Sequence, residues 1–272
     1  MHAKRTSLLS KKKRYLQVAL NSTLSEAVAI IRTLPPSDRI IIEAGTPLIK
    51  QYGMEAIRTL YSEWSMRLAM NSIGGGSTAN LGNLPGLIGM VANEIAKNSR
   101  IKKTHNALPT EGRSVPYIAA DMKTMDRGRA EVAMAANAGA SAVIGLGSAP
   151  TETINAFIDA CEEFGVDSML DMMNVEFPLA VLRALKRPPT VVVLHRGVDE
   201  ERDNRQKMLP LHEVRRVKGG YDIMIAVAGG DTPREVQSAA FNDADIVVIW
   251  KSVFESNEQT SELVDSFLKT IQ

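Results

Sequence analysis

The sequence contains one cysteine, Cys161, so no disulfide can form within the chain. This fits a protein that works in a reducing compartment. No apolar run approaches the roughly 20 residues that a membrane-spanning helix requires, and the first residues lack the apolar core of a secretory signal. We therefore expect a soluble cytoplasmic protein with no membrane partner.

A surplus of charge is also absent. The chain has 32 Lys and Arg residues against 31 Asp and Glu residues, which gives a formal net charge of +1. Binding to nucleic acid draws on a basic surplus that neutralises phosphates. The composition therefore predicts no nucleic-acid partner.

What the sequence does contain is a regular alternation of short apolar runs and amphipathic helical patterns. We expect strands at Tyr15–Leu20, Arg39–Glu43, Val115–Asp121, Ala142–Leu146, Asp167–Asp171, Thr190–His195, Ile223–Ala228 and Ile246–Trp250. We expect helices at Leu24–Thr33, Arg127–Ala138, Thr151–Phe164, Val175–Leu185, Pro233–Phe241 and Asn257–Leu268. Strands that alternate with helices indicate a parallel sheet, and their continuous apolar character indicates burial on both faces. Eight such units within 272 residues predict a single (β/α)8 TIM-barrel domain. A doubly wound open sheet is the alternative.

Residues 66–113 interrupt this alternation between the second and third units. The segment is rich in glycine, including Gly74-Gly75-Gly76, and carries one short helical pattern at Ile88–Lys97. A phosphate-binding loop is one interpretation, but no Gly-Lys-Ser/Thr follows the glycines. An amphipathic helix that meets a membrane or a partner is another. Loops of this length are usually lids, interaction elements or disordered insertions, and we favour a lid or an oligomer contact.

The motif with the clearest chemical content is Asp121-Met122-Lys123-Thr124-Met125-Asp126, which follows the apolar run that ends at Ala120. In an extended chain, Asp121 and Lys123 lie on the same face. Burial of both charges costs several kcal/mol unless they pair with each other or with a ligand. A structural ion pair would satisfy this condition. The third charge, Asp126, favours an active site.

Polar residues and glycines also follow the other predicted strands. They are Asn21, Glu43, Gly145 with Gly147, Asp171 with Asn174, His195 with Arg196, Gly229 with Gly230, and Lys251. Taken singly, Asp171 could cap a helix and His195 could be a core histidine. In a TIM barrel, however, all these residues lie at the carboxyl ends of the strands, where active sites are built. Their convergence therefore predicts one shared polar site.

The residue types suggest the chemistry of that site. Glu43 and Asp121 supply two carboxylates, the hard oxygen ligands that suit Mg²⁺. A metal there would stabilise the negative charge of a sugar enediolate. Lys123 would add a cation or a hydrogen-bond donor. His195 is the candidate acid–base group because its ordinary pKa lies near neutrality.

Phosphate is the expected anion at the rim of this site. The sequence AVAGGDTP places Gly229 and Gly230 just before a predicted helix, where backbone amides and the helix N-terminus bind phosphate. Arg196 could contact the same anion or the polar end of the substrate.

Together these residues resemble the orotidine-5'-phosphate decarboxylase superfamily, and within it the archaeal type of 3-hexulose-6-phosphate synthase. The resembling stretches are LQVALN (16–21), IIEAGTPLIKQYGMEAIRTL (41–60), AADMKTMDRGRAEVAMAANAGA (119–140), VLHRGVDE (193–200) and AVAGGDTP (226–233). The resemblance implies a TIM barrel that forms a homodimer with shared active sites, in which Asp126 reaches the partner's site. It also implies a Mg²⁺-dependent aldol condensation of formaldehyde with ribulose 5-phosphate, and its reverse.

Glu43 distinguishes branches of this superfamily. The resemblance implies a lysine at this position in the metal-free decarboxylase that makes UMP, and a carboxylate in the metal-dependent branch. Three residues depart from the family pattern: Asn21 replaces an aspartate, and Trp250 and Lys251 replace a Gly-Arg pair that holds phosphate. Asn21 and Lys251 are still expected to bind substrate, Lys251 as a point charge without the fork of arginine. The alternatives are a decarboxylase or aldolase for another phosphosugar, and a catalytically altered paralogue with a binding role.

Overall fold

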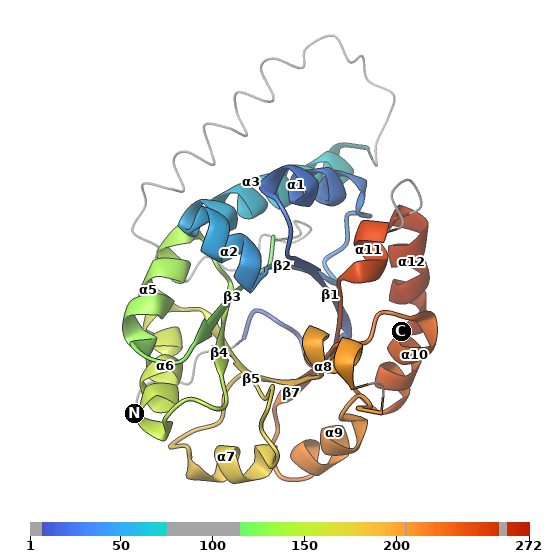
Figure 1. Cartoon of the computed structure of the whole chain (residues 1–272). Coiled ribbons are helices and arrows are strands. Elements are labelled where there is room, and N and C mark those ends of the chain that lie inside the picture. Colours follow the sequence, from blue (N-terminus) through green and yellow to red (C-terminus); the bar gives the residue numbers. More distant parts are fainter. Residues whose placement is uncertain (1–6, 75–114, 205, 256–259) are drawn as a thin grey trace.

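The protein is a closed barrel of eight parallel strands surrounded by helices (Figure 1). The computed structural model describes residues 7–74, 115–204, 206–255 and 260–272. The strands are β1 (Tyr15–Leu20), β2 (Ile40–Ala44), β3 (Ile118–Thr124), β4 (Ala142–Leu146), β5 (Asp167–Asp171), β6 (Val191–His195), β7 (Met224–Ala228) and β8 (Ile246–Ile249). They pair in chain order, and β1 pairs with β8 to close the ring. The predicted TIM barrel is confirmed, and the open-sheet alternative is wrong.

Helices cover the outside of the barrel. They are α1 (Leu24–Thr33), α2 (Thr46–Tyr52), α3 (Met54–Gly74), α5 (Gly128–Ala138), α6 (Thr151–Phe164), α7 (Pro178–Ala184), α8 (Val198–Asp203), α9 (Leu211–Lys218), α10 (Pro233–Phe241), α11 (Lys251–Glu255) and α12 (Thr260–Thr270). Capping residues in the sequence determine where some of these helices begin. Thr232 caps α10 and forms a capping box with Glu235, and Pro233 follows in the first turn. Within the described residues, no helix is both long and apolar enough to cross a membrane.

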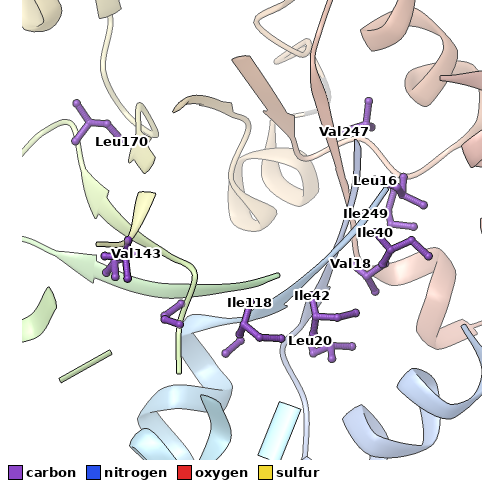
Figure 2. Packing of buried hydrophobic residues seen from close by; sticks show 14 of the residues in the cluster. Leu16, Val18, Leu20, Ile40, Ile42, Ile118, Val143, Leu170, Val247 and Ile249 are labelled. Atoms are coloured by element: carbon purple, nitrogen blue, oxygen red, sulfur yellow. The ribbon is translucent and has the colours of Figure 1, made fainter. Parts of the chain in front are cut away.

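The core has two layers, because successive residues of a strand face opposite sides of the sheet. One set of side chains packs outward against the helices. Figure 2 shows Leu16, Val18 and Leu20 of β1 in this layer together with Ile40 and Ile42 of β2. The other set fills the barrel interior and includes Ala19, Ile41, Ala119, Ile144 and Met169. Strands buried on both faces explain the continuous apolar runs of the sequence.

This alternation places the polar residues of the strands inside the barrel. Gln17 lies two residues before Ala19 on β1, Glu43 two after Ile41 on β2, and Asp121 two after Ala119 on β3. All three therefore share the inward parity. Their side chains are buried. Glu43 and Asp121 stand near the carboxyl ends of β2 and β3, and Gln17 lies deeper in the barrel, at the level of Ile41.

The structure corrects two predicted boundaries around the second and third units. Residues 66–74 do not belong to an insertion, because they continue α3. The remainder of the predicted insertion, with its glycines and the helical pattern at Ile88–Lys97, lies outside the described residues. β3 is also shifted: Val115 is 61% exposed and precedes the strand, which runs on to Thr124.

The carboxyl end of β3 is irregular. Its pairing with β4 shifts register between Asp121 and Thr124, and Lys123 has a φ of 48°. That left-handed conformation is uncommon for a residue with a side chain. The motif around Lys123 is therefore a bulge inside the end of the strand rather than a loop that follows it.

Candidate active site

A cavity of about 390 Å³ opens at the carboxyl ends of the barrel strands. Seven of the predicted site residues line it: Asn21, Glu43, Asp121, Lys123, His195, Gly229 and Lys251. Three others, Asp126, Arg196 and Gly230, are not among the described residues that line it. The structure therefore brings most of the predicted side chains together around one cavity, as expected for the carboxyl ends of the strands in a TIM barrel.

Lys123 is the centre of a buried charge cluster. Its Nζ lies 2.5 Å from Oδ2 of Asp171 and 3.1 Å from Oδ2 of Asp121. The same Asp171 oxygen lies 2.8 Å from Nδ1 of His195. The predicted pairing of Asp121 with Lys123 is present, although the bulge and not a regular strand produces it.

Asp171 was expected at the shared polar site, but the sequence assigned it no chemical role. Its Oδ1 accepts a hydrogen bond from the backbone N–H of Met173, which is the local turn that an aspartate after a strand suggests. Its Oδ2 contacts both Lys123 and His195. The signal that could have indicated its role is parity: Asp171 and His195 both face inward at the ends of adjacent strands.

These contacts fix the charge of the cluster. Burial lowers the pKa of Lys123, but the charges of Asp121 and Asp171 outweigh burial and raise it. Burial raises the pKa of Asp171, and the His195 and Lys123 contacts then bring it well below its usual range. Burial lowers the pKa of His195, but Asp171 reverses this, so the net shift is upward.

Glu43 has the opposite environment. Burial, followed by repulsion from the Asp121 charge, raises its pKa to about 7. The side-chain amide of Gln17 opposes this shift, since Nε2 donates a hydrogen bond to Oε2 of Glu43 over 2.5 Å. The charges of Lys123 and His195 also oppose the shift but do not cancel it. A cation bound between the two carboxylates would relieve their repulsion.

The donor set around Glu43 and Asp121 fits Mg²⁺. Oδ1 of Asp121 and Oε1 of Gln17 are buried and have no hydrogen-bond partner within the described residues. Buried polar oxygens without hydrogen-bond partners are rare. Two such oxygens beside the Glu43 carboxylate suit a hard cation that keeps some of its water ligands. Within the described part of the chain, no group of three or more His, Cys, Asp or Glu side chains could hold a metal by itself. Glu43 and Asp121 therefore remain the two candidate protein ligands.

The Glu-Ala-Gly-Thr-Pro sequence, which joins the end of β2 to the start of α2, has a local structural reason. Gly45 leaves room for Asn21, because a Cβ at this position would overlap the amide oxygen of Asn21. The hydroxyl of Thr46 is 2.9 Å from Oδ2 of Asp121 and 2.9 Å from its carbonyl oxygen. Pro47 then lies in the first turn of α2. The motif thus joins the ends of β1, β2 and β3.

Arg196, predicted to contact the anion or the polar end of the substrate, makes several contacts within the protein. Its Nε donates to the carbonyl oxygen of Gly229 over 3.0 Å, and its Nη2 lies 2.9 Å from Oε1 of Glu235. Gly229 has a φ of 94°, and a Cβ there would overlap the Arg196 carbonyl. The hydrogen bond between Arg196 and Gly229 therefore links the segment that follows β6 to the segment that follows β7. Gly230 packs against Leu209 and Glu235 beside it.

The two residues after β8 are anchored through their backbone. The Asp231 carboxylate accepts hydrogen bonds from the N–H groups of Trp250, over 2.6 Å, and Lys251, over 2.7 Å. The Trp250 ring makes an edge contact with Phe254 at a centroid distance of 6.5 Å. Trp250 is also one of the residues that line the cavity, and it leaves the cavity open.

Asp126 lies beyond the end of β3. The residues around it, Met125 and Arg127, are exposed like Asp126 itself, and Arg127 begins α5 with a left-handed φ of 53°. The predicted role of Asp126 in a partner's site stays a prediction.

Known proteins resemble this chain in sequence. The sequence profile of the family described as orotidine 5'-phosphate decarboxylase / HUMPS matches residues 102–264. The bifunctional enzyme Fae/Hps of Methanosphaera stadtmanae is 34% identical over 250 residues, which is 90% of this chain and 50% of that protein. The corresponding enzyme of Methanocella arvoryzae is 31% identical over 250 residues, covering 91% of this chain and 51% of its own length. The chain therefore spans about half the length of these relatives.

Solved structures share the fold. The 3-hexulose-6-phosphate synthase of Salmonella typhimurium superposes with a TM-score of 0.70 at 22% identity, covering 94% of this chain and 98% of that one. The 3-keto-L-gulonate-6-phosphate decarboxylase of Vibrio cholerae gives a TM-score of 0.61 at 19% identity, with coverages of 96% and 99%. At these sequence identities the similarity shows a shared barrel fold and no more.

Proposed function

Because this chain belongs to the orotidine 5'-phosphate decarboxylase / HUMPS family, we propose that it is a Mg²⁺-dependent carbon–carbon lyase of the 3-hexulose-6-phosphate synthase type. The reaction is the aldol condensation of formaldehyde with ribulose 5-phosphate, and its reverse. The observation that carries the proposal is the buried cluster of Asp121, Lys123, Asp171 and His195 beside Glu43 and an unpaired oxygen of Asp121. Such a cluster combines a cation site with an acid–base group in one cavity.

Each residue has a role that follows from its contacts. Glu43 and Asp121 hold Mg²⁺, which when bound acts as a Lewis acid for the charge that develops on the sugar oxygens. Lys123, kept cationic by its ion pairs with Asp121 and Asp171, would stabilise the same charge electrostatically. Asp171 engages Nδ1 of His195, which leaves Nε2 as the nitrogen that exchanges protons with substrate.

The proton transfers balance as follows. Nε2 of His195 accepts the proton from C1 of ribulose 5-phosphate, and C1 then forms a bond with the carbon of formaldehyde. The former carbonyl oxygen of formaldehyde then takes the proton back from Nε2 of His195 and becomes a hydroxyl group, which returns His195 to its neutral form. The Gly229 turn and Lys251 lie across the cavity and bind the phosphate.

The direct test is consumption of ribulose 5-phosphate that depends on formaldehyde, measured with Mg²⁺ and again with EDTA. We expect consumption with Mg²⁺ and none with EDTA. Absence of consumption by folded protein in Mg²⁺ contradicts the proposal. A panel that includes 3-keto-gulonate 6-phosphate and orotidine 5'-phosphate then separates this substrate from the alternatives. The open cavity beside Trp250 favours an enzyme over an altered paralogue.

The proposal predicts a steep dependence on pH below neutrality. Mg²⁺ requires ionised Glu43, whose pKa is raised to about 7, and C1 deprotonation requires neutral His195, whose pKa is also raised. Both groups must therefore lose a proton as the pH rises. We expect log kcat/KM to increase with a slope near two at low Mg²⁺ and near one at saturating Mg²⁺. Equal slopes at both concentrations would contradict the assignment of Glu43 as a ligand.

The proposal also includes a homodimer with shared active sites. Asp126 is exposed at the end of β3 and outside the cavity of its own chain, which supports a role in the partner's site. Variants Asp126→Asn and His195→Gln should each be weakly active alone. Mixing unfolded subunits in equal amounts and refolding them should restore about a quarter of wild-type activity, since half of the dimers are mixed and one site in each is intact. No recovery, with dimers present in light scattering, argues that each site belongs to one chain.

A further inference from the structure

The cavity contains three basic side chains, and each has an acidic partner. Lys123 pairs with Asp121 and Asp171, His195 pairs with Asp171, and Lys251 pairs with Glu201 at 2.6 Å. No cation among the described cavity residues is therefore free for an incoming phosphate. An anion that pairs with one of these basic side chains must therefore displace a carboxylate.

The pair between Lys251 and Glu201 is the easiest to open. Its side chains are 34% and 33% exposed, whereas Lys123 is 20% exposed and its partner Asp171 only 1%. Breaking a partly exposed pair costs at most about 1 kcal/mol, while breaking a buried pair costs several times more. Phosphate should therefore compete at Lys251.

The structure also provides a second position for the displaced carboxylate. Oε1 of Glu201 lies 3.6 Å from Nη2 of Arg196, which is already held by Glu235 and the Gly229 carbonyl. Glu201 can therefore leave Lys251 without losing all contact with a cation. Lys251 stays in place because Asp231 anchors its backbone.

We propose that Glu201 is a displaceable carboxylate that occupies the anion subsite at Lys251 until the phosphate of the substrate replaces it. The inference rests on the proposed function, since it assumes that phosphate binds at Lys251. The exchange gives Lys251 a way to discriminate between anions. A phosphate dianion is attracted to Lys251 more strongly than the single charge of Glu201 is, whereas a monoanion is not. Glu201 would thus select phosphorylated substrates over carboxylated ones.

The test is the Kd of inorganic phosphate at pH 8, measured by calorimetry. The variants are Glu201→Gln, Lys251→Gln and the double variant. Asp199→Asn is the matched control, because it removes the same charge from α8 at a residue that is 86% exposed and pairs with Arg202. Glu201→Gln should lower Kd about threefold to fivefold, and Asp199→Asn by less than about 1.5-fold at physiological salt. In the Lys251→Gln background, the effect of Glu201→Gln should disappear.

Each other outcome has one meaning. If Lys251→Gln weakens phosphate binding while Glu201→Gln behaves like Asp199→Asn, the displacement is wrong and the phosphate site stands. If Lys251→Gln binds phosphate as the wild type does, the phosphate subsite of the proposed function is wrong and the inference falls with it. If the effect of Glu201→Gln persists without Lys251, Glu201 acts on another group and the inference is overturned. Glu201→Ala, checked by circular dichroism, provides a second test of the first result.

Discussion

Replacement of Asp121 by Asn is expected to lower kcat/KM for the proposed condensation by about a thousandfold, because loss of a metal ligand removes several kcal/mol of charge stabilisation. Oδ1 of Asp121 has no partner among the described residues, and Oδ2 contacts Lys123 and Thr46. An amide keeps the shape of the side chain but lacks the charge, and its NH₂ group cannot bind a cation.

Two controls make this result specific. Asp265→Asn removes one carboxylate from an exposed position on α12 and should leave kcat/KM within twofold. Titration with Mg²⁺ by calorimetry should detect binding to the wild type and to Asp265→Asn but not to Asp121→Asn. Mg²⁺ binding by Asp121→Asn with wild-type affinity would remove Asp121 from the metal site.

Replacement of Lys123 by Met should destabilise the protein by about 3 to 5 kcal/mol at pH 7.5, as measured by urea unfolding. The lysine is the shared partner of two carboxylates, Asp121 at 8% and Asp171 at 1% exposure. Without it, two buried negative charges face each other, and only His195 remains beside Asp171. The matched control is Lys13→Met, in which the broken pair with Asp38 is about half exposed and should cost less than about 1 kcal/mol.

The pH dependence of this loss has a definite sign. The pKa of Asp171 is lowered in the folded protein, so its pairing contributes stability above the ordinary pKa of an aspartate, and that contribution is lost as the pH falls through the folded value. The pKa of Lys123 is raised, so its contribution is complete at neutral pH and is lost only at strongly alkaline pH. The difference between Lys123→Met and the wild type should therefore shrink in acid. A difference that stays constant down to pH 3 would indicate lost packing instead of lost charge.

The sequence predicts the barrel well because its strands are buried on both faces and produce continuous apolar runs. It also predicts Glu43, Asp121, Lys123 and His195 as neighbours, since parallel strands end at the same rim of the barrel. The sequence analysis assigned no helix to Met54–Gly74, which forms α3, because the apolar residues of this helix are spread around it and do not follow one face.

The remaining features depend on contacts between distant segments. Asp171 has a satisfactory local explanation as a turn residue, so its contacts with Lys123 and His195 are visible only in the folded barrel. Arg196 was predicted to contact the anion or the polar end of the substrate, and its bonds to Gly229 and Glu235 were not predicted. These partners lie more than 30 residues away, and the charge of an arginine does not indicate which one it will choose.

The most direct test of the metal-dependent lyase is formation of the new carbon–carbon bond. Carbon-13-labelled formaldehyde, ribulose 5-phosphate and Mg²⁺ should be incubated with the wild type and followed by NMR. We predict that the label moves into a hydroxymethyl carbon bonded to the former C1 of the pentulose, and that EDTA or Asp121→Asn prevents this. Label that remains in free formaldehyde with folded, Mg²⁺-loaded wild type, or transfer that continues in EDTA, would contradict the account.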